Sequence, residues 1–391
     1  MRDKVLMLAS VASMIDQFNI PNIKLLIDMG YKVDVACNFL EGSTCSDAKI
    51  DKLKNKLTAM GVDYYQIDFA RSVRHILQNL KAYRQVLRLM KANRYKFIHC
   101  HSPIGGVCGR LAGHKTYTKV IYTAHGFHFY KGAPLLNWFV YYPIEKYLSR
   151  YTDVLITINK EDYAIARNKM HAKRTEYVPG VGIDIEKIKS VKVDRNKKRA
   201  ELGIPKDAIM LLSVGELSRR KNHEVVIRAL AEMKYRNVVY AICGKGTLES
   251  YLKKLADNLG VSDRVFLLGF RTDVTEICKA ADIFVFPSLQ EGLPVALMEA
   301  MACGLPVVCS NIRGNIDLIN DNENGILFNS LDIDAMAVAM RTMLDNIKFR
   351  KQCALGNIEI VKQFDLHRSL SAMEEIYITT EKIETLTGDS K

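Results

Sequence analysis

Several features are scarce or missing from this sequence, and each absence removes a class of protein. No run of about 18 apolar residues occurs, so we expect no transmembrane helix. The nine cysteines form no C-x-x-C pair and no Cys/His cluster at zinc spacing. Because their number is odd, a disulfide framework is not expected and a reducing cytosol is favoured. The amino terminus has only a short apolar run before Asp16, which predicts a first β-strand and not a signal peptide.

Acidic residues are missing from one long stretch. Between Phe69 and Ile144 there is no Asp or Glu, and the whole chain has a net charge of +13. A field of this kind attracts an anionic partner, and the candidates are nucleic acid, a phospholipid surface and a phosphorylated substrate. The stretch contains twelve basic residues, Arg71, Arg74, Lys81, Arg84, Arg88, Lys91, Arg94, Lys96, Arg110, Lys115, Lys119 and Lys131.

What is present indicates a two-domain α/β protein. The 391 residues exceed one ordinary domain, and 48% apolar with 25% charged residues is a globular composition. Apolar strand patterns alternate with helical patterns in both halves, which favours doubly wound parallel sheets. The turn Pro179–Gly182 and the change of composition after it set the domain boundary. We expect domains at 1–182 and 183–365, then a helix and polar tail at 366–391, for which a return to the first domain is one alternative.

The stretch Phe284–Val308 predicts a strand, a loop, a helix and a second strand. Pro294 suits the first turn of a helix, and Gly304 followed by Pro306 suits its end. Two carboxylates bracket the unit, Glu291 in the loop and Glu299 on the helix. An ordinary βαβ unit explains the pattern, and a site in which both carboxylates bind ligand hydroxyls is the sharper hypothesis.

Other strand ends of the second half carry groups that suit a diphosphate. Lys221, Gly244 and Arg271 each follow a predicted strand, and the Glu291 loop precedes a helix N-terminus. Backbone amides and the helix dipole at such an edge favour negative charge. A carboxylate would repel phosphate but accepts strong hydrogen bonds from hydroxyls. A ligand with a diphosphate and many hydroxyls is a nucleotide sugar.

The first half has two histidines at strand ends and two amphipathic segments. His101 and His125 follow neighbouring predicted strands, where ligands of parallel sheets sit, although a lone histidine there is more often structural. Val73–Asn93 predicts a helix with an apolar face and a basic face, which suits either a packed, solvated helix or a membrane surface. The aromatic segment Leu135–Leu148 either packs on the sheet or lies in a lipid interface, and Pro143 is expected to kink or interrupt it.

The motifs of the second half resemble those of a known family. Glu291-Gly-Leu-Pro-Val-Ala-Leu-Met-Glu299 is similar to the E-x₇-E motif of retaining family-4 glycosyltransferases of the two-domain GT-B type. The resemblance extends to SVGELSRRKN at 213–222, ICGKG at 242–246 and FLLGFRTDV at 266–274. In the first half, HCHSPIGGVCGRLAG at 99–113 and TAHGFHFYKG at 123–132 look like the bacterial exopolysaccharide and capsule branch.

The resemblance implies a GT-B fold, two Rossmann-like domains that face each other across a cleft, and a set of roles. Glu291 would contact the donor sugar, Glu299 the ribose, and Lys221 would neutralise the departing diphosphate, which is electrostatic stabilisation of the transition state. His125 would face the donor sugar as a third catalytic residue. The family needs no metal and no further cofactor. The other donor-binding residues expected are Gly292, Leu293, Pro294, Gly244, Arg271 and, more weakly, Arg219.

Two departures from the family pattern leave parts of the site open. Glu216 stands where the family commonly has arginine, so Arg219 or Arg220 would have to supply the positive charge. The exit loop of the first strand lacks the paired glycines of many relatives, which leaves the acceptor side with His101 and Ser13 as its only candidates.

The sequence thus predicts a cytoplasmic, membrane-peripheral, retaining hexosyltransferase. Its donor would be a UDP-sugar, and its acceptor a saccharide on a polyprenyl diphosphate at the inner membrane face, used in surface polysaccharide biosynthesis. The basic first domain would bind the anionic membrane, and nucleic acid is not an expected partner. The alternatives are a non-transferring GT-B relative such as a nucleotide-sugar 2-epimerase, and a nucleic-acid-binding protein that uses the basic domain.

Overall fold

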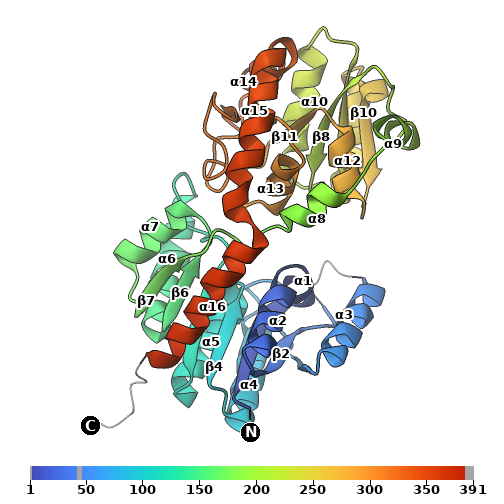
Figure 1. Cartoon of the computed structure of the whole chain (residues 1–391). Helices are drawn as coiled ribbons and strands as arrows, with labels where there is room; N and C mark the ends of the chain where they lie inside the picture. Colours follow the sequence, from blue (N-terminus) through green and yellow to red (C-terminus); the bar gives the residue numbers. More distant parts are fainter. Residues whose placement is uncertain (1, 42–45, 384–391) are drawn as a thin grey trace. The chain divides into compact units, whose positions relative to one another are not determined.

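The computed structural model divides the chain into two compact units (Figure 1). It describes residues 2–41 and 46–383, so the end of the predicted polar tail lies outside the described residues. The first unit comprises residues 1–181 and 367–391, and the second comprises residues 182–366. The helix after residue 366 therefore belongs to the first unit, although the rest of that unit precedes the second one in the chain.

The first unit is built on a parallel sheet of seven strands in the order β3-β2-β1-β4-β5-β6-β7. The chain order reverses between β1 and β4, and this reversal creates the crevice where ligands of doubly wound sheets bind. The strands are β1 (Lys4–Val11), β2 (Lys32–Asn38), β3 (Asp63–Gln66), β4 (Phe97–His101), β5 (Lys119–Ala124), β6 (Val154–Thr157) and β7 (Arg174–Tyr177).

Helices cover both faces of this sheet. On one face, the core includes side chains of α2, α3 and α16, and Tyr377 of α16 is fully buried against the strands. On the other face, the core includes side chains of α4, α5 and α7, with aromatic residues of α6 at its margin. The helices of the unit are α1 (Ala12–Met14), a π-helical turn (Ile15–Asn19), α2 (Ile20–Asp28), α3 (Asp47–Ala59), α4 (Ile76–Asn93), α5 (Pro103–Thr116), α6 (Leu135–Leu148), α7 (Lys160–Lys169) and α16 (Leu366–Lys382).

The second unit repeats the architecture with six parallel strands in the order β10-β9-β8-β11-β12-β13. Its order reverses between β8 and β11, so the loops after these two strands flank the crevice. The strands are β8 (Ile209–Val214), β9 (Val238–Cys243), β10 (Val265–Gly269), β11 (Ile283–Phe286), β12 (Val307–Ser310) and β13 (Gly325–Phe328). The helices are α8 (Ile185–Ser190), α9 (Arg195–Glu201), α10 (His223–Glu232), α11 (Glu249–Asn258), α12 (Val274–Ala280), α13 (Val295–Ala302), α14 (Ile333–Asp345) and α15 (Ile347–Ile360).

The fold class predicted from the sequence, two doubly wound α/β units, is confirmed. The strand–loop–helix–strand reading of 284–308 matches β11, α13 and β12, with Gly304 in the left-handed region (φ 74°) after the helix. Pro294 immediately precedes α13 and does not lie within its first turn.

Two expectations about the first unit need correction. Pro143 does not interrupt the aromatic segment, because α6 is one helix from Leu135 to Leu148. The apolar face of Val73–Asn93 is not packed throughout. Its second half is buried at Val86 and Met90, whereas Ile76, Leu77 and Leu80 are exposed. Among the described residues, no helix is both long and apolar enough to cross a bilayer.

Candidate functional site

The loops after β8 and β11 are joined by direct hydrogen bonds. Asn222 adopts a left-handed backbone (φ 54°), and its side-chain amide donates to the carbonyl oxygens of Pro287 (3.2 Å) and Ser330 (2.7 Å). The amide of Leu289 donates to the carbonyl of Arg220 at 2.8 Å. These bonds connect the loop at 218–222 to the loop at 287–292, so residues 70 positions apart in sequence form one edge of the crevice.

A charged cluster lies between the two loops. The Lys221 ammonium donates to Oε1 of Glu291 at 2.7 Å, and Nη1 of Arg220 donates to the same oxygen at 2.9 Å. Both Lys221 and Glu291 are largely buried, with about a tenth of each side chain exposed. Burial lowers the pKa of Lys221, and the Glu291 carboxylate opposes that effect. Two cations on one carboxylate leave a net positive charge, which is an arrangement that attracts an anion.

Further contacts fix the geometry of this cluster. The Lys221 ammonium lies 4.5 Å from the centre of the Phe286 ring, a cation–π contact. Nε of the buried Arg313 donates to the backbone carbonyl of Glu291 at 3.1 Å. Gly314 has a φ of 82°, and a Cβ at this position would lie 2.2 Å from the carbonyl oxygen of Gly292. The Glu291 loop is thus held at its backbone and at its side chain.

The start of α13 offers free donors beside the cluster. Within the described part of the chain, the amides of Gly292 and Leu293 donate no hydrogen bond. Glu299 lies about one turn into α13, half-buried, and burial raises the pKa of its carboxyl group. No hydrogen bond or ion pair among residues 2–41 and 46–383 satisfies that carboxylate. Free amides in the loop before α13 and an unpaired carboxylate on that helix fit a ligand with both anionic and hydroxyl groups.

The structure distinguishes the two arginines that the sequence left open. Arg220 contacts Glu291, and it also donates to the carbonyl of Gln290 at 3.1 Å. Arg219 instead lines a separate cavity of about 300 Å³ with Tyr251 and Leu252. Arg220 is therefore the arginine that stands in the cluster with Lys221.

Two other predicted donor residues have structural partners of their own. The amide of Gly244 donates to the carbonyl of Gly269 at 2.8 Å, and a Cβ on Gly244 would lie 1.8 Å from the carbonyl oxygen of Gly215. Close packing of two loops therefore explains this glycine, and its amide is already used. Arg271 donates to Asp273 (2.6 and 2.8 Å) and to Glu201 (2.7 Å). Among the described residues, Arg271 forms no hydrogen bond or ion pair with Lys221 or Glu291.

One acidic pair in the second unit has a structural explanation. Asp332-Ile333-Asp334 has the Asp-x-Asp spacing found in some metal-dependent transferases. Asp332 accepts the amide of Ala335 at 2.8 Å as the N-cap of α14. Among the described residues, no group of three or more His, Cys, Asp or Glu side chains is arranged to hold a metal ion.

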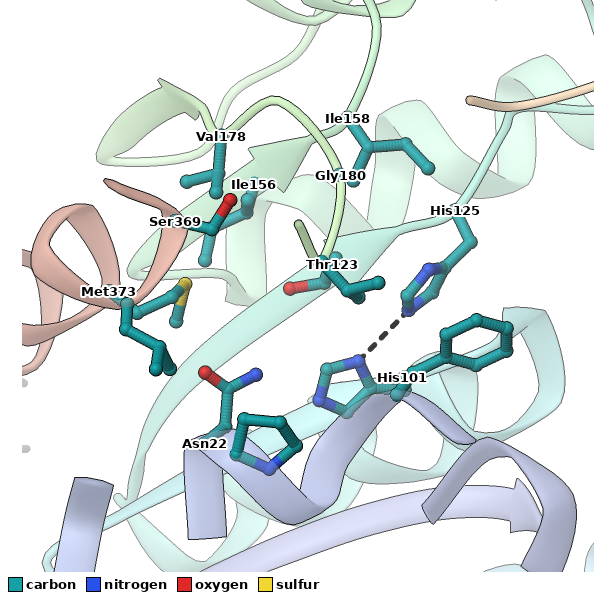
Figure 2. Close-up of a pocket in the computed structure, with 14 residues that line it drawn as sticks. Asn22, His101, Thr123, His125, Ile156, Ile158, Val178, Gly180, Ser369 and Met373 are labelled. Carbon is teal, nitrogen blue, oxygen red and sulfur yellow. Dashed lines mark hydrogen bonds between the residues drawn. The ribbon is translucent and has the colours of Figure 1, made fainter. Parts of the chain in front are cut away.

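The two predicted histidines of the first unit lie in contact (Figure 2). Nδ1 of His101 and Nε2 of His125 are 3.0 Å apart. The other nitrogen of His101 lies 3.2 Å from the sulfur of Met7. Burial lowers the pKa of His125 to about 4 and that of His101 well below its ordinary value. Both rings are therefore neutral at pH 7, and each carries one N–H.

The contact with Met7 assigns the positions of these protons. A thioether sulfur accepts weakly and cannot donate, so Nε2 of His101 carries its proton toward the sulfur. Nδ1 of His101 then accepts the N–H from Nε2 of His125. This leaves a lone pair on Nδ1 of His125, which can accept a hydrogen bond from a hydroxyl. His101 thereby acts as a positioning residue for His125.

A third histidine, which the sequence did not single out, continues the network. His99 contacts the Thr123 hydroxyl (2.8 Å) and the Tyr377 hydroxyl (2.9 Å), and its ring lies 4.2 Å from that of His101. The cavity beside His101 and His125 measures about 20 Å³, room for about one water molecule. Ser13, the other predicted acceptor-side residue, is buried in α1 directly after β1.

Comparisons with known proteins match this architecture over nearly its whole length. Residues 4–159 match the family described as glycosyl transferase 4-like, and residues 194–357 match glycosyl transferases group 1. A putative glycosyltransferase of Bacillus subtilis, EpsD, is 34% identical over 96% of this chain and 97% of its own. An Escherichia coli UDP-Gal:alpha-D-GlcNAc-diphosphoundecaprenol alpha-1,3-galactosyltransferase is 29% identical over 78% of this chain and 80% of its own.

Solved structures show the same fold. HepE from Anabaena, crystallised with UDP and glucose, superposes with a TM-score of 0.77 at 20% identity, and the match covers 97% of this chain and 100% of that one. WaaG, a glycosyltransferase involved in lipopolysaccharide biosynthesis, gives a TM-score of 0.70 at 18% identity over 95% and 99% of the two chains. The chain therefore belongs to the glycosyltransferases and has the GT-B fold.

Proposed function

We propose that this glycosyltransferase moves a hexose-type sugar from a UDP-sugar to a saccharide carried on a polyprenyl diphosphate, with retention of anomeric configuration. The observation that carries the donor part is the cluster of Lys221, Arg220 and Glu291 beside the free amides of α13. The Escherichia coli relative, whose name specifies a UDP-galactose donor and a diphosphoundecaprenol acceptor, supports the substrate classes. The process served is surface polysaccharide biosynthesis of the exopolysaccharide or capsule type.

In this mechanism the cations change partner when the donor binds. Glu291 accepts hydroxyls of the donor sugar, and Glu299 accepts the hydroxyls of the ribose. Lys221 and Arg220 then donate to the diphosphate and neutralise the charge that develops as it leaves. The amides of Gly292 and Leu293 add donors beside Pro294 without any change of charge. His125 contacts the donor sugar as a hydrogen-bond acceptor. No step of this scheme uses a metal ion or a further cofactor.

A ligand screen tests the donor assignment. Nucleotides and nucleotide sugars would be added to the protein during thermal unfolding, because a ligand that binds only the folded state raises the transition temperature. We expect UDP and at least one UDP-sugar to raise it. The rise in transition temperature should be smaller for the Glu299→Ala variant, since the ribose hydroxyls lose the carboxylate that accepts their hydrogen bonds. If no uridine nucleotide changes the transition while another nucleotide does, the UDP assignment is wrong.

Incubation without acceptor separates transfer from epimerisation. The proposal predicts that UDP-sugars stay unchanged, apart from slow hydrolysis, until a lipid-linked saccharide is added. Clean conversion of a UDP-sugar to its 2-epimer without acceptor would identify the protein as an epimerase instead. Anomer-specific NMR of the product reports retention or inversion directly.

The acceptor class places the enzyme at the cytoplasmic face of the membrane as a peripheral protein. The acid-free basic stretch supplies the charge for an anionic surface, at about 1 kcal/mol for each Lys or Arg near the lipid. Arg84 and Arg88 are both exposed on α4. Reversal of these two charges, Arg84→Glu with Arg88→Glu, should weaken binding to anionic vesicles. Unchanged co-sedimentation would contradict the electrostatic part of the proposal, and a salt-sensitive gel shift with RNA or DNA would favour a nucleic-acid partner for this face.

A further inference from the structure

Helix α6 turns an apolar stripe toward solvent. Leu135, Leu136 and Phe139 are 75%, 70% and 76% exposed, and Val140 and Ile144 are also exposed. We call these five residues the outer stripe. Their spacing of one, three and four positions places them on one side of the helix. The aromatic residues of α6 pack against the core on its other side, so this helix carries apolar side chains on both its inner and its outer side.

A groove lies between this helix and its neighbours. It has a volume of about 470 Å³ and is lined by α4, α5 and α6 together with the turn before α4. Its lining from the earlier part of the chain includes Val73, Ile76 and Leu80, and Val140 and Ile144 of the outer stripe line the other side. Pockets that bind small apolar ligands have volumes of about 300–1,000 Å³. The outer stripe and the groove therefore form one continuous apolar surface.

The unpaired charges on α4 and in the turn before it are positive. Arg74, Arg84 and Arg88 are exposed, and within the described part of the chain none of them pairs with a carboxylate. The only acidic residue of α6, Glu145, lines the groove, and its carboxylate accepts Nη1 of the fully buried Arg110 at 2.7 Å. Because this ion pair neutralises the acid, the exterior of α4 and α6 combines apolar side chains with unbalanced positive charge.

We propose that the outer stripe and the groove dock into an anionic lipid bilayer, with a hydrocarbon chain of a bilayer lipid in the groove. Apolar side chains flanked by cations match the two layers of such a surface, hydrocarbon beneath anionic headgroups. A second copy of this chain is a poorer occupant, since its own cations would face those of the first copy across the contact. The inference rests on the proposed function in one respect, the membrane-bound acceptor, which this docking would bring to the enzyme.

The chain carries a reporter for this contact. Its one tryptophan, Trp138, lies on α6 next to Phe139, and its indole N–H donates to the carbonyl of Tyr130 at 3.2 Å. Vesicles of phosphatidylcholine and phosphatidylglycerol would be prepared with bromine on the acyl chains, which quenches tryptophan at short range. We expect binding to these vesicles, with quenching of Trp138, and little binding to vesicles of phosphatidylcholine alone. Quenching with bromine on the acyl chains distinguishes insertion from adsorption at the headgroups.

Paired variants separate the apolar contribution from the electrostatic one. Leu136→Ser with Phe139→Ser should weaken partitioning into the anionic vesicles about tenfold or more, because two large apolar side chains are lost. Leu331→Ser with Leu355→Ser is the matched control, since these residues are 77% and 68% exposed but lie in the second unit. The control should bind vesicles like the parent protein, and both variants should keep the parent's transition temperature because all four side chains face solvent.

Three results would overturn the inference. The first is equal vesicle binding by the outer-stripe variant and the parent. The second is binding without quenching from the acyl chains. The third is binding that requires a polyprenyl diphosphate in the vesicles, which would assign the groove to the acceptor lipid instead. The rise in transition temperature caused by UDP tests the donor site independently of the vesicle experiments. A normal rise in the outer-stripe variant, together with lost vesicle binding, supports docking. No rise in the parent protein contradicts the proposed function and leaves the docking result unchanged.

Discussion

The two units place opposite kinds of side chain at the carboxyl ends of their parallel strands. In the second unit, the loops after β8 and β11 carry Lys221 and Glu291, charged groups that satisfy each other across 2.7 Å. In the first unit, β4 ends in His101 and β5 is followed by His125, rings that burial keeps neutral. The crevice of the second unit holds charged side chains that suit an anionic ligand, whereas the crevice of the first unit offers neutral hydrogen-bond acceptors. The comparison shows that the fold determines where a site lies, whereas the charge of its side chains determines which ligands it can bind.

The largest effect is expected at the charged crevice. Glu291→Ala and Lys221→Ala should each lower turnover by about a hundredfold to a thousandfold, the range seen when one electrostatic contact to a transition state is removed. Circular dichroism should show that both variants stay folded. Glu359→Ala removes an exposed carboxylate of the same unit and serves as the control. Near-normal turnover of either variant would refute the role proposed for that residue.

The second comparison is between neighbouring arginines. Arg220→Gln should reduce kcat/KM for the nucleotide sugar by about tenfold, because a charge-assisted contact contributes about 1.5–3 kcal/mol. Arg219→Gln should have little effect, since Arg219 makes no contact with Glu291 in the described structure. Steady-state kinetics with a varied donor concentration measure both. Equal losses would mean that the two cations act together on the ligand.

The buried, neutral histidines of the first unit should make the stability of the protein depend on pH. Burial lowers the pKa of His99 to about 3 from an ordinary 6.5. Between these values the unfolded chain binds more protons, so the free energy of unfolding falls as pH decreases, by about 1.4 kcal/mol per pH unit for each such histidine. His99→Gln should flatten the slope of transition temperature against pH from 6.5 to 4.5. The exposed His114→Gln should not, and an unchanged slope in both would contradict the neutral buried state.

The smallest expected effect concerns the proton between His101 and His125. Nitrogen-15 NMR of the histidines should find Nε2 of His125 protonated and Nδ1 unprotonated at pH 7. Met7→Leu removes the sulfur that faces His101 and should allow the opposite arrangement, with a fall in turnover of a few-fold and no change in donor affinity. Protonation of Nδ1 in the parent protein would reverse the assignment.

The parts of the fold that the sequence predicted are those with strong local signals. The sequence pattern predicts buried strands at 97–101, 209–214 and 238–243, and these ranges match β4, β8 and β9, because four or more apolar residues between turn signals leave few alternatives. The edge strand β7 and helix α15 were missed. All four residues of β7 are only half-buried, and α15 has no clear apolar side, so neither shows the periodicity that a sequence can reveal.

The candidate site likewise contains residues that the sequence could identify and residues that it could not. Glu291 and Glu299 belong to one contiguous motif, and the sequence could associate them. Arg220 could not be separated from Arg219, because the two adjacent residues have the same chemistry and only the turn of the loop determines which one meets Glu291. Arg313 and Asn222 gave no signal, since their importance lies in contacts with distant carbonyls. On α4 the sequence indicated an apolar face, but periodicity does not say whether a neighbour covers it.

The position of Tyr377 has a consequence for how the protein is made. This residue, fully buried with Met373 and Ile376 in the core of the first unit, is synthesised only after the whole of the second unit. Residues 182–366 are by then already outside and can fold by themselves. The unit whose synthesis begins first is therefore completed after the second one. During each round of translation, one face of its β-sheet stays partly uncovered until α16 is synthesised.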